Sequence, residues 1–443
     1  MQVIAIKVEG NKKTKSSIIL REMDFAVGDS LLITDFKTRF EINKLNILNT
    51  GLFTDVNLNI KDWDQKQKRV TIVITVKENW YIYPLFLVEL ADRNFNVWWQ
   101  EQDRSFKRIN FGLDLYHTNL TGNKDRLKIG VLFGYKQKYE IGYRFPYLNK
   151  AQTLGFKFDA YYSRRKEIAY QTIEDKLAFD RADDQFQLYR FKTGVSFQYR
   201  KKIRSYHNVR LAFRQNKISE RVAAELNPAY LLNGATEQKV PSLSYEFVYD
   251  ARDVRPYPMK GNYLSGAIVK EGFGFFKDRN SLALSGRFRQ LIPLHPKSSI
   301  DVYLSAKREL VRKKQPYVDY QALGYQRDFL RGYELYVIDG MDFAYTQLTF
   351  KYELFNFNFN WGIFMPLKQM KNMPVRVMLT YNNDIGYVND TQFSSLNNLG
   401  NTMLWGTGLG VDFIVYYDKI IQFQLSRNHL NEYGFFLHNK IFL

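Results

Sequence analysis

Residues 127–134 read Leu-Lys-Ile-Gly-Val-Leu-Phe-Gly, and residues 139–145 read Tyr-Glu-Ile-Gly-Tyr-Arg-Phe. These two stretches indicate the fold class most clearly. In both, large apolar or aromatic side chains occupy every second position, and the residues between them are charged or small except Leu132, which is the period of a β-strand with two different faces. The same alternation recurs at 245–250, 375–382 and 421–426. Because a charge on the lipid face at mid-membrane costs about 2–4 kcal/mol, the polar face must point into a lumen. The pattern therefore predicts a mainly β protein built around a transmembrane antiparallel β-barrel.

About sixteen such segments are expected between residues 79 and 443, a number typical of outer-membrane barrels. Short connections are typical of the periplasmic side of these barrels, and long connections of the outer surface. Periplasmic turns are therefore expected at 119–125, 256–261 and 295–298, and surface loops at 165–187 and 217–240. The longest and least strand-like connection is 310–341, and a loop of that length usually has a function.

Composition narrows the possible classes of protein. Aromatic residues make up 16% of the chain, yet its mean hydropathy is −0.39, so aromatic and polar side chains are interleaved. The formal net charge of +19 would suit nucleic acid, but Lys and Arg are spread along the whole chain. We expect them to face anionic lipid headgroups, and we expect no nucleic-acid partner. The chain has no cysteine and five scattered histidines, so we expect no metal site and no cofactor.

Residues 1–78 follow a different pattern, which predicts a small α+β domain ahead of the barrel at 79–443. The expected elements are a strand at 3–8, a helix near 16–22, a second helix after Thr34 and strands around 56–60 and 70–76. Thr34 is expected to cap the second helix through its hydroxyl group. The predicted order of elements is β-α-α-β-β.

Several motifs resemble those of one known family, and they occur in the order in which that family carries them. The N-terminal domain resembles a POTRA domain through its Gly-(Leu/Tyr)-Phe-x-x-Val motif, matched at Gly51, Leu52, Phe53 and Val56. Residues 119–123 resemble the family's Asn-Leu-x-Gly turn, and residues 250–263 its Asp-x-Arg-Asp…Pro-x-x-Gly-x-Tyr stretch. The chain is thus similar to the BamA/TamA superfamily, also called the bacterial surface antigen family.

Two more motifs bear on mechanism. The stretch Arg331-Gly332-Tyr333 resembles the tip of a family surface loop that folds back into the lumen, so the resemblance implies that 310–341 is infolded. Asp384 and Gly386 resemble the Asp-x-Gly of a family barrel strand, although Asn replaces the aromatic residue that usually precedes them. Asp384 has lumen-facing parity, and the planar guanidinium group of Arg331 suits a carboxylate. We expect these two residues to pair; the alternative is that Arg331 is a solvated loop residue.

The last strand is expected to meet the first barrel strand at a closing seam. The predicted seam residues are Gly434, Phe435, Leu437, Ile441, Phe442 and Leu443. Members of the family usually end in an outward-facing aromatic residue, whereas this sequence has Phe442 in the penultimate position and Leu443 last.

No Gly-x-Ser-x-Gly elbow, phosphate loop or metal-ligand cluster occurs, so we expect no enzyme activity. The resemblance implies a barrel that assembles outer-membrane proteins or translocates polypeptides in a Gram-negative bacterium, with the N-terminal domain in the periplasm. Expected partners are unfolded or secreted polypeptides, lipid and lipopolysaccharide, and periplasmic proteins or lipoproteins that bind the POTRA domain. The alternative is a passive pore, or a membrane-anchoring barrel of a larger protein, for example one with an N-terminal lipase domain. The chain enters a strand without a signal sequence, so a mature or truncated form is expected.

Overall fold

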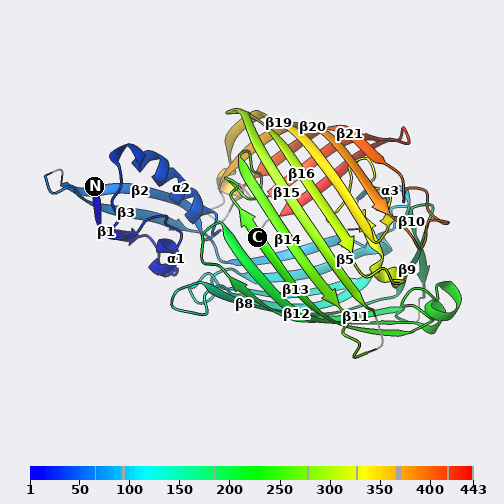
Figure 1. Cartoon of the computed structure of the whole chain (residues 1–443). Coiled ribbons are helices and arrows are strands. Elements are labelled where there is room, and N and C mark those ends of the chain that lie inside the picture. The colour runs from blue at the N-terminus through cyan, green and yellow to red at the C-terminus, as the bar shows by residue number, and fades with distance from the viewer. Residues whose placement is uncertain are drawn as a thin grey trace.

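A computed structural model describes the chain except residues 65, 92–94, 183–184, 277–278, 326–327, 366–370, 417–418 and 442–443, and the side chains of 364 and 439–441. It has two parts, a small N-terminal domain and a large β-barrel, with the small domain at one end of the barrel (Figure 1). No helix in the described part of the chain is long and apolar enough to cross a membrane.

The N-terminal domain is a three-stranded sheet with two helices. Its elements are β1 (Gln2–Glu9), α1 (Ser16–Leu20), η1 (Ile33–Asp35), α2 (Phe36–Leu48), β2 (Phe53–Asp64) and β3 (Arg69–Glu78). The sheet order is β1-β3-β2, with β1 parallel and β2 antiparallel to β3. The core lies between sheet and helices, where Ile18, Ile47 and Ile72 are fully buried.

The expected cap at Thr34 is wrong. The helix α2 begins two residues later, after the 3-10 turn η1, and no side chain caps it. The Thr34 hydroxyl instead donates to the Asp35 carboxylate at 3.1 Å. A capping hydroxyl would accept a hydrogen bond from a backbone N–H of the first helical turn, but Thr34 lies inside η1, so the local sequence signal did not predict the helix start.

The barrel sheet has sixteen antiparallel strands, which confirms the predicted fold class. The barrel strands are β4 (Ile82–Leu90), β5 (Ile109–His117), β6 (Arg126–Gly134), β7 (Lys136–Phe145), β8 (Leu154–Arg165), β11 (Leu188–Tyr199), β12 (Ser205–Ile218), β13 (Glu237–Asp250), β14 (Gly261–Glu271), β15 (Ser281–His295), β16 (Ser298–Glu309), β19 (Asp342–Asn360), β20 (Asn372–Asn389), β21 (Leu404–Val415), β22 (Lys419–Asn428) and β23 (Tyr433–Ile441). Each barrel strand between β4 and β23 pairs with the barrel strands before and after it in the chain, so the sheet is one meander from β4 to β23.

The two faces of the sheet differ as the alternation predicts. Large apolar side chains that are exposed point outward, among them Ile129, Ile141 and Leu211. Side chains of the opposite parity, such as Asp384 and Asp412, are buried in the interior. Apolar groups thus lie where lipid would surround the barrel, and polar groups lie where they can be hydrogen-bonded.

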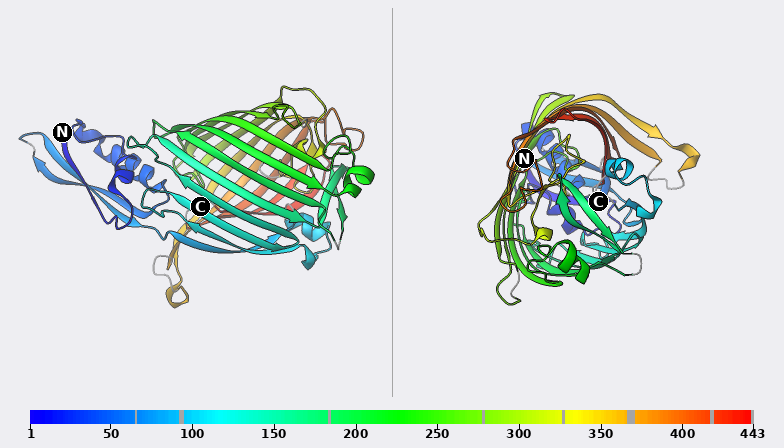
Figure 2. Two further views of the ribbon diagram at one scale, coloured as in Figure 1. Left: turned by 90° about the horizontal axis from the view of Figure 1, so that it is seen from below. Right: turned by 90° about the vertical axis from the view of Figure 1, so that its right-hand side faces the viewer.

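The short turns lie at the end of the barrel that carries the N-terminal domain. The Lys15 amide donates to the Gly122 carbonyl at 3.0 Å, and the Asn49 side chain donates to the Asp253 carbonyl at 3.0 Å. The long connections lie at the other end, which Figure 2 (right) views along the barrel.

One long connection is more regular than the sequence suggested. Residues 165–187, expected to be a surface loop, contain the hairpin β9 (Glu167–Ile173) and β10 (Lys176–Arg181). One face of β9 carries Ile168, which is 1% exposed, and this burial provides the apolar packing that an isolated hairpin lacks. The connection after β12 contains a short π-helical turn, η3 (Val222–Leu226).

Candidate functional site

The lumen loop, defined as residues 310–341 between β16 and β19, is packed inside the barrel. It contains η4 (Tyr317–Asp319) and the short strands β17 (Gln321–Leu323) and β18 (Ile338–Asp339), which pair with each other. Tyr320, Leu323 and Leu330 are each 1% exposed, so the loop has a core of its own against the barrel wall. A surface loop in water would not bury such side chains, so this segment is a plug.

Arg331 and Asp384 lie together inside the lumen. The Arg331 Nε lies 3.0 and 2.9 Å from the two Asp384 carboxylate oxygens, and the Arg331 backbone amide donates to the same carboxylate at 2.9 Å. The Arg331 Nη2 pairs with this carboxylate as well, while Nη1 donates to Thr349 at 2.9 Å and to Asn382. The two residues are 7% and 1% exposed. A buried ion pair needs further hydrogen bonds of this kind to offset its desolvation, and this pair has them.

Asn382 therefore has a role that the family motif did not indicate. It stands where the family usually has an aromatic residue, and its side-chain oxygen accepts a hydrogen bond from Arg331. Gln347, on the adjacent strand β19, also donates to Asp384, at 3.2 Å. Together these polar groups surround the ion pair on two neighbouring strands.

The glycines of the two motifs allow backbone and wall to approach closely. Gly332 has φ +88°, a left-handed conformation, and a Cβ there would lie 3.2 Å from the Arg427 carbonyl oxygen. At Gly386, a Cβ would lie 2.7 Å from the Leu330 side chain. Tyr333, the third motif residue, is buried and donates its hydroxyl to the Trp405 carbonyl at 2.9 Å. The tip of the lumen loop thus lies against β20, β21 and β22.

Gly406 was not among the predicted site residues, although a glycine repeat in the sequence marks it. A Cβ at Gly406 would lie 2.0 Å from the Arg331 carbonyl oxygen, so only glycine fits beside the loop tip. Gly406, Gly408 and Gly410 occupy every second position of β21, on its lumen face. Glycine repeated with the period of a strand marks a place where another segment approaches the sheet.

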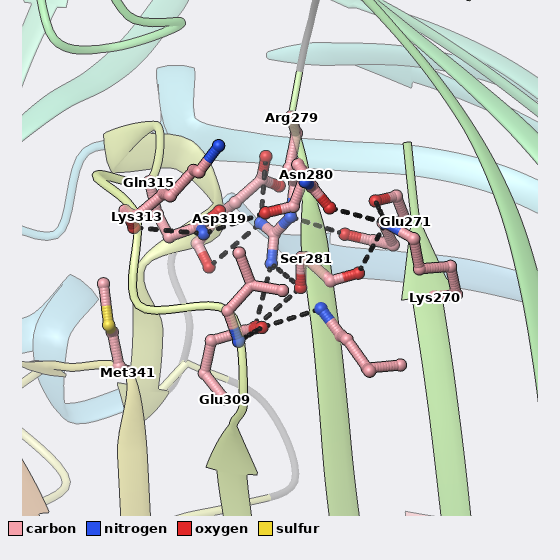
Figure 3. Close-up of polar contacts among 12 residues, drawn as sticks. Lys270, Glu271, Arg279, Asn280, Ser281, Glu309, Lys313, Gln315, Asp319 and Met341 are labelled. Carbon is pink, nitrogen blue, oxygen red and sulfur yellow. Dashed lines mark hydrogen bonds and ion pairs between the residues drawn. The ribbon is translucent and has the colours of Figure 1, made fainter. Parts of the chain in front are cut away.

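A second anchor of the lumen loop was also missed (Figure 3). Asp319, at the end of η4, pairs with Arg214 of β12 and lies 3.1 Å from Arg279, which precedes β15. Gln238 of β13 donates to the same carboxylate at 3.0 Å. Arg279 in turn contacts Glu271 at 2.8 Å, so the anchor belongs to a larger buried network. The loop is therefore fixed to two separate parts of the wall.

The hairpin β9–β10, which we call the lid hairpin, lies over the loop. Its Thr172 hydroxyl shares a hydrogen bond of 2.8 Å with the hydroxyl of Tyr317, and the Val337 amide donates to the Asp175 carbonyl at 2.8 Å. The Asp175 carboxylate also accepts a hydrogen bond of 2.9 Å from the Asn398 amide, in the connection between β20 and β21. At its base, Glu167 forms a buried ion pair with Arg108. The lid hairpin thus joins opposite sides of the barrel mouth.

The first and last barrel strands form a seam without a hydrogen-bonded ladder. Among the described residues, no backbone pairing joins β4 to β23. The short helix α3 (Phe95–Gln100), which follows β4 in the chain, contacts β23 there, and Asn96 donates to the Phe435 carbonyl.

The predicted seam residues are placed as follows. Gly434 allows the ring of Phe436 to approach, since a Cβ at Gly434 would lie 2.2 Å from that ring. Phe435 points outward and is 59% exposed, and Leu437 has the same parity. Ile441 ends β23, but its side chain, together with Phe442 and Leu443, lies outside the described residues.

The POTRA-like motif closes the core of the N-terminal domain. Leu52, Phe53 and Val56 are buried in that core. Gly51 has φ +75° three residues after the last residue of α2, where a left-handed residue turns the chain away from the helix.

A buried charge cluster joins this domain to the barrel. Glu22, just after α1, accepts two hydrogen bonds from Arg200, at 2.9 and 3.0 Å, and lies 3.7 Å from Lys124. Burial alone would raise the pKa of Glu22, but Lys124 and Arg200 lower it to about 2. Burial lowers the pKa of Lys124 to about 7, although Glu22 opposes that shift. The domain is therefore docked electrostatically on the turns before β6 and β12.

This junction should depend on pH. Docking holds Glu22 deprotonated, so its contribution is present above pH 4.5 and is lost as pH falls towards 2. Lys124 has a depressed pKa, so docking strengthens as pH rises from about 7 to 10.5. Hydrogen exchange of the Gly122 turn should show both transitions. Glu22→Gln should weaken docking by about 3 kcal/mol and remove the acid transition; an unchanged acid transition in this variant would contradict the assignment.

A transmembrane barrel of sixteen strands with a docked POTRA-like domain defines the class of outer-membrane proteins that carry POTRA domains. The sequence profile of the Omp85 superfamily domain matches residues 119–415, and that of the POTRA domain, described as a surface antigen variable number repeat, matches residues 2–79. The chain belongs to the Omp85 superfamily, as its resemblance to the BamA/TamA proteins implied. It is accordingly a barrel for membrane-protein assembly or polypeptide translocation.

Solved structures show the same fold at low sequence identity. BamA from Haemophilus ducreyi lacking POTRA domains 1–3 is 14% identical with a TM-score of 0.55, over 100% of this chain and 85% of that one. CdiB from Escherichia coli is 12% identical with a TM-score of 0.56, over 99% of this chain and 75% of that one. CdiB from Acinetobacter baumannii is 13% identical with a TM-score of 0.51, over 99% and 73%. A comparison with curated protein sequences gives no match.

Proposed function

We propose that this protein inserts β-barrel proteins into the outer membrane of a Gram-negative bacterium, or moves polypeptides across it, through the seam between β4 and β23. The observation that carries this proposal is the combination of a plugged lumen with a seam at which the described residues form no backbone pairing. An unpaired strand edge is a template for an incoming strand, whereas a passive pore would need a clear lumen. The proposal includes no catalytic step.

The POTRA domain offers a second place for an extended client. Strand β2 is at an edge of its sheet and, in the described part of the chain, pairs only with β3. An incoming strand could add to this edge by main-chain hydrogen bonds. We place this domain in the periplasm, where unfolded clients and periplasmic proteins or lipoproteins would reach it. Lipid and lipopolysaccharide would surround the apolar outer face of the barrel.

Depletion of the protein, followed by proteomics of the outer membrane and the medium, tests this function. Loss of many barrel proteins would indicate general assembly, and loss of one or two proteins a dedicated route; either result supports the proposal. Complementation with the wild-type chain is the control. If depletion changes no outer-membrane or secreted protein, the protein has another role, such as the anchoring alternative.

A further inference from the structure

One side of the lumen is strongly basic. We call the lumen-facing side chains of β6, β7, β8, β11 and β12 the basic wall. Lysines and arginines recur on this face, yet Glu140 and Asp159 are the only acidic residues on these five strands. The high net charge of the protein is thus concentrated partly inside the barrel, where lipid headgroups do not reach.

The two acidic residues are already paired. Glu140 forms ion pairs with Lys128 and Lys138. Asp159 pairs with Arg210 at 2.7 Å and with Lys157 at 3.1 Å. No carboxylate of the wall therefore remains for its other cations.

Five cations of the wall form no ion pair with any described residue: Lys136, Arg144, Arg165, Arg190 and Lys192. Two of them have neutral partners, since Arg144 donates to Gln198 at 3.1 Å and Arg190 donates to Asn216 at 2.8 Å. The Nε of Arg165 is buried without a hydrogen-bond partner. Clustered cations in a confined lumen repel one another, and an anionic ligand would relieve that repulsion.

The half of the wall nearer the POTRA domain borders open space. A cavity of about 640 Å³ lies against it, lined among others by Lys128, Arg144 and Arg210, whereas Lys136, Arg165, Arg190 and Lys192 lie nearer the outer end and do not line it. Lys136 and Arg144 stand at opposite ends of the same face of β7, roughly 27 Å apart at the rise of a strand. The tip of the lumen loop does not fill this space, because it lies against β20, β21 and β22.

The basic wall has the POTRA domain at one end and the lid hairpin at the other. Tyr147, just beyond Arg144, packs on the core of the POTRA domain. At the other end, the lid hairpin follows directly after Arg165. A ligand would therefore enter from the POTRA side, and the cavity is too small for a folded domain, so its occupant would be a short extended segment.

We propose that the basic wall binds acidic, extended segments of polypeptide clients. This inference rests on the proposed function and adds the chemical class of segment that the lumen selects. Carboxylates of a client would form charge-assisted hydrogen bonds with the unpaired lysines and arginines of the wall. The lid hairpin lies across the outer end of the wall, so a bound segment would leave through the seam and not through the barrel mouth.

The test measures binding of labelled 20-residue peptides to the full-length chain in detergent micelles. One peptide alternates Glu and Ser, and a second has Gln in place of Glu. The acidic peptide should bind to the wild-type protein, and its affinity should fall as salt is added. Its affinity should be about tenfold lower for the double variant Lys136→Gln/Lys192→Gln, the wall variant. The matched control, Lys217→Gln/Lys239→Gln, removes the same charge from residues of outward parity on β12 and β13 and should bind as the wild type does.

Arg144→Gln, at the POTRA end of the wall, is a second variant. Heat-modifiable migration on gels shows whether each variant is folded. Equal loss of binding in the wall variant and the control, or no loss in either, overturns the proposal. Binding of a heparin fragment without binding of the acidic peptide also overturns it, because the wall would then select glycans. If depletion removes clients while the peptide fails to bind, this inference fails and the proposed function stands.

Discussion

Replacing Arg331 with alanine is expected to lower the free energy of unfolding of the barrel by about 3–5 kcal/mol. The substitution leaves Asp384, which is 1% exposed, as a buried carboxylate without its cation. It also removes the hydrogen bonds to Thr349 and Asn382. Urea titration of the folded barrel, followed by heat-modifiable migration, measures the change.

Arg312→Ala is the matched control, because Arg312 belongs to the same loop and pairs with Asp342 at 2.6 Å near the solvent. An exposed pair contributes about 0–1 kcal/mol, so this variant should resemble the wild type. In a double-mutant cycle, Arg331→Glu alone should lower the free energy of unfolding of the barrel. Adding Asp384→Arg to that variant should partly restore it. Absence of coupling, or equal effects of the two alanine variants, would show that the lumen pair does not hold the loop.

The second large effect concerns ion conductance. An intact chain in a planar bilayer should show low, unsteady conductance, because the lumen loop and the lid hairpin obstruct the barrel. Replacing residues 311–340 with a short Gly-Ser turn should raise conductance by about tenfold, since a sixteen-stranded barrel without a plug leaves an aqueous channel. Lys307 already pairs with Phe343, so the two strands can be joined directly.

Asp319→Asn provides an intermediate case. It weakens only the second anchor, so conductance should fluctuate more than in the wild type and remain below that of the loop replacement. A steady, large conductance in the intact chain would instead favour the passive pore.

The strand pattern and the lumen pair could be predicted from sequence for a physical reason. Lipid on one side and a polar lumen on the other impose a period of two that any single strand displays. The pairing of Arg331 with Asp384 was also accessible, because parity placed Asp384 inside and the loop motif supplied the arginine. Both inferences needed only local pattern and one family motif.

The remaining contacts depend on groups that are distant in the chain and carry no local signature. Asp319 looks like an ordinary loop carboxylate, and only the fold brings it to Arg214, over a hundred residues away in sequence. The lid hairpin similarly looked like a polar surface loop, because its stability comes from packing Ile168 against other loops. The glycine repeat of β21 was a readable signal whose partner, the loop tip, could not be identified from spacing alone.

If clients pass through the seam between β4 and β23, reversible closure of that seam should stop their delivery. The chain has no cysteine, so Asn96→Cys/Phe435→Cys can join α3 to β23, where Asn96 contacts the Phe435 carbonyl. The matched control, Leu425→Cys/Phe435→Cys, joins two strands that are already paired. The measurement is the amount of client protein reaching the outer membrane or medium of a depleted strain that carries each variant. We predict that oxidation stops client delivery in the seam variant, that a reductant restores it, and that the control is unaffected; full delivery through the cross-linked seam would contradict the account.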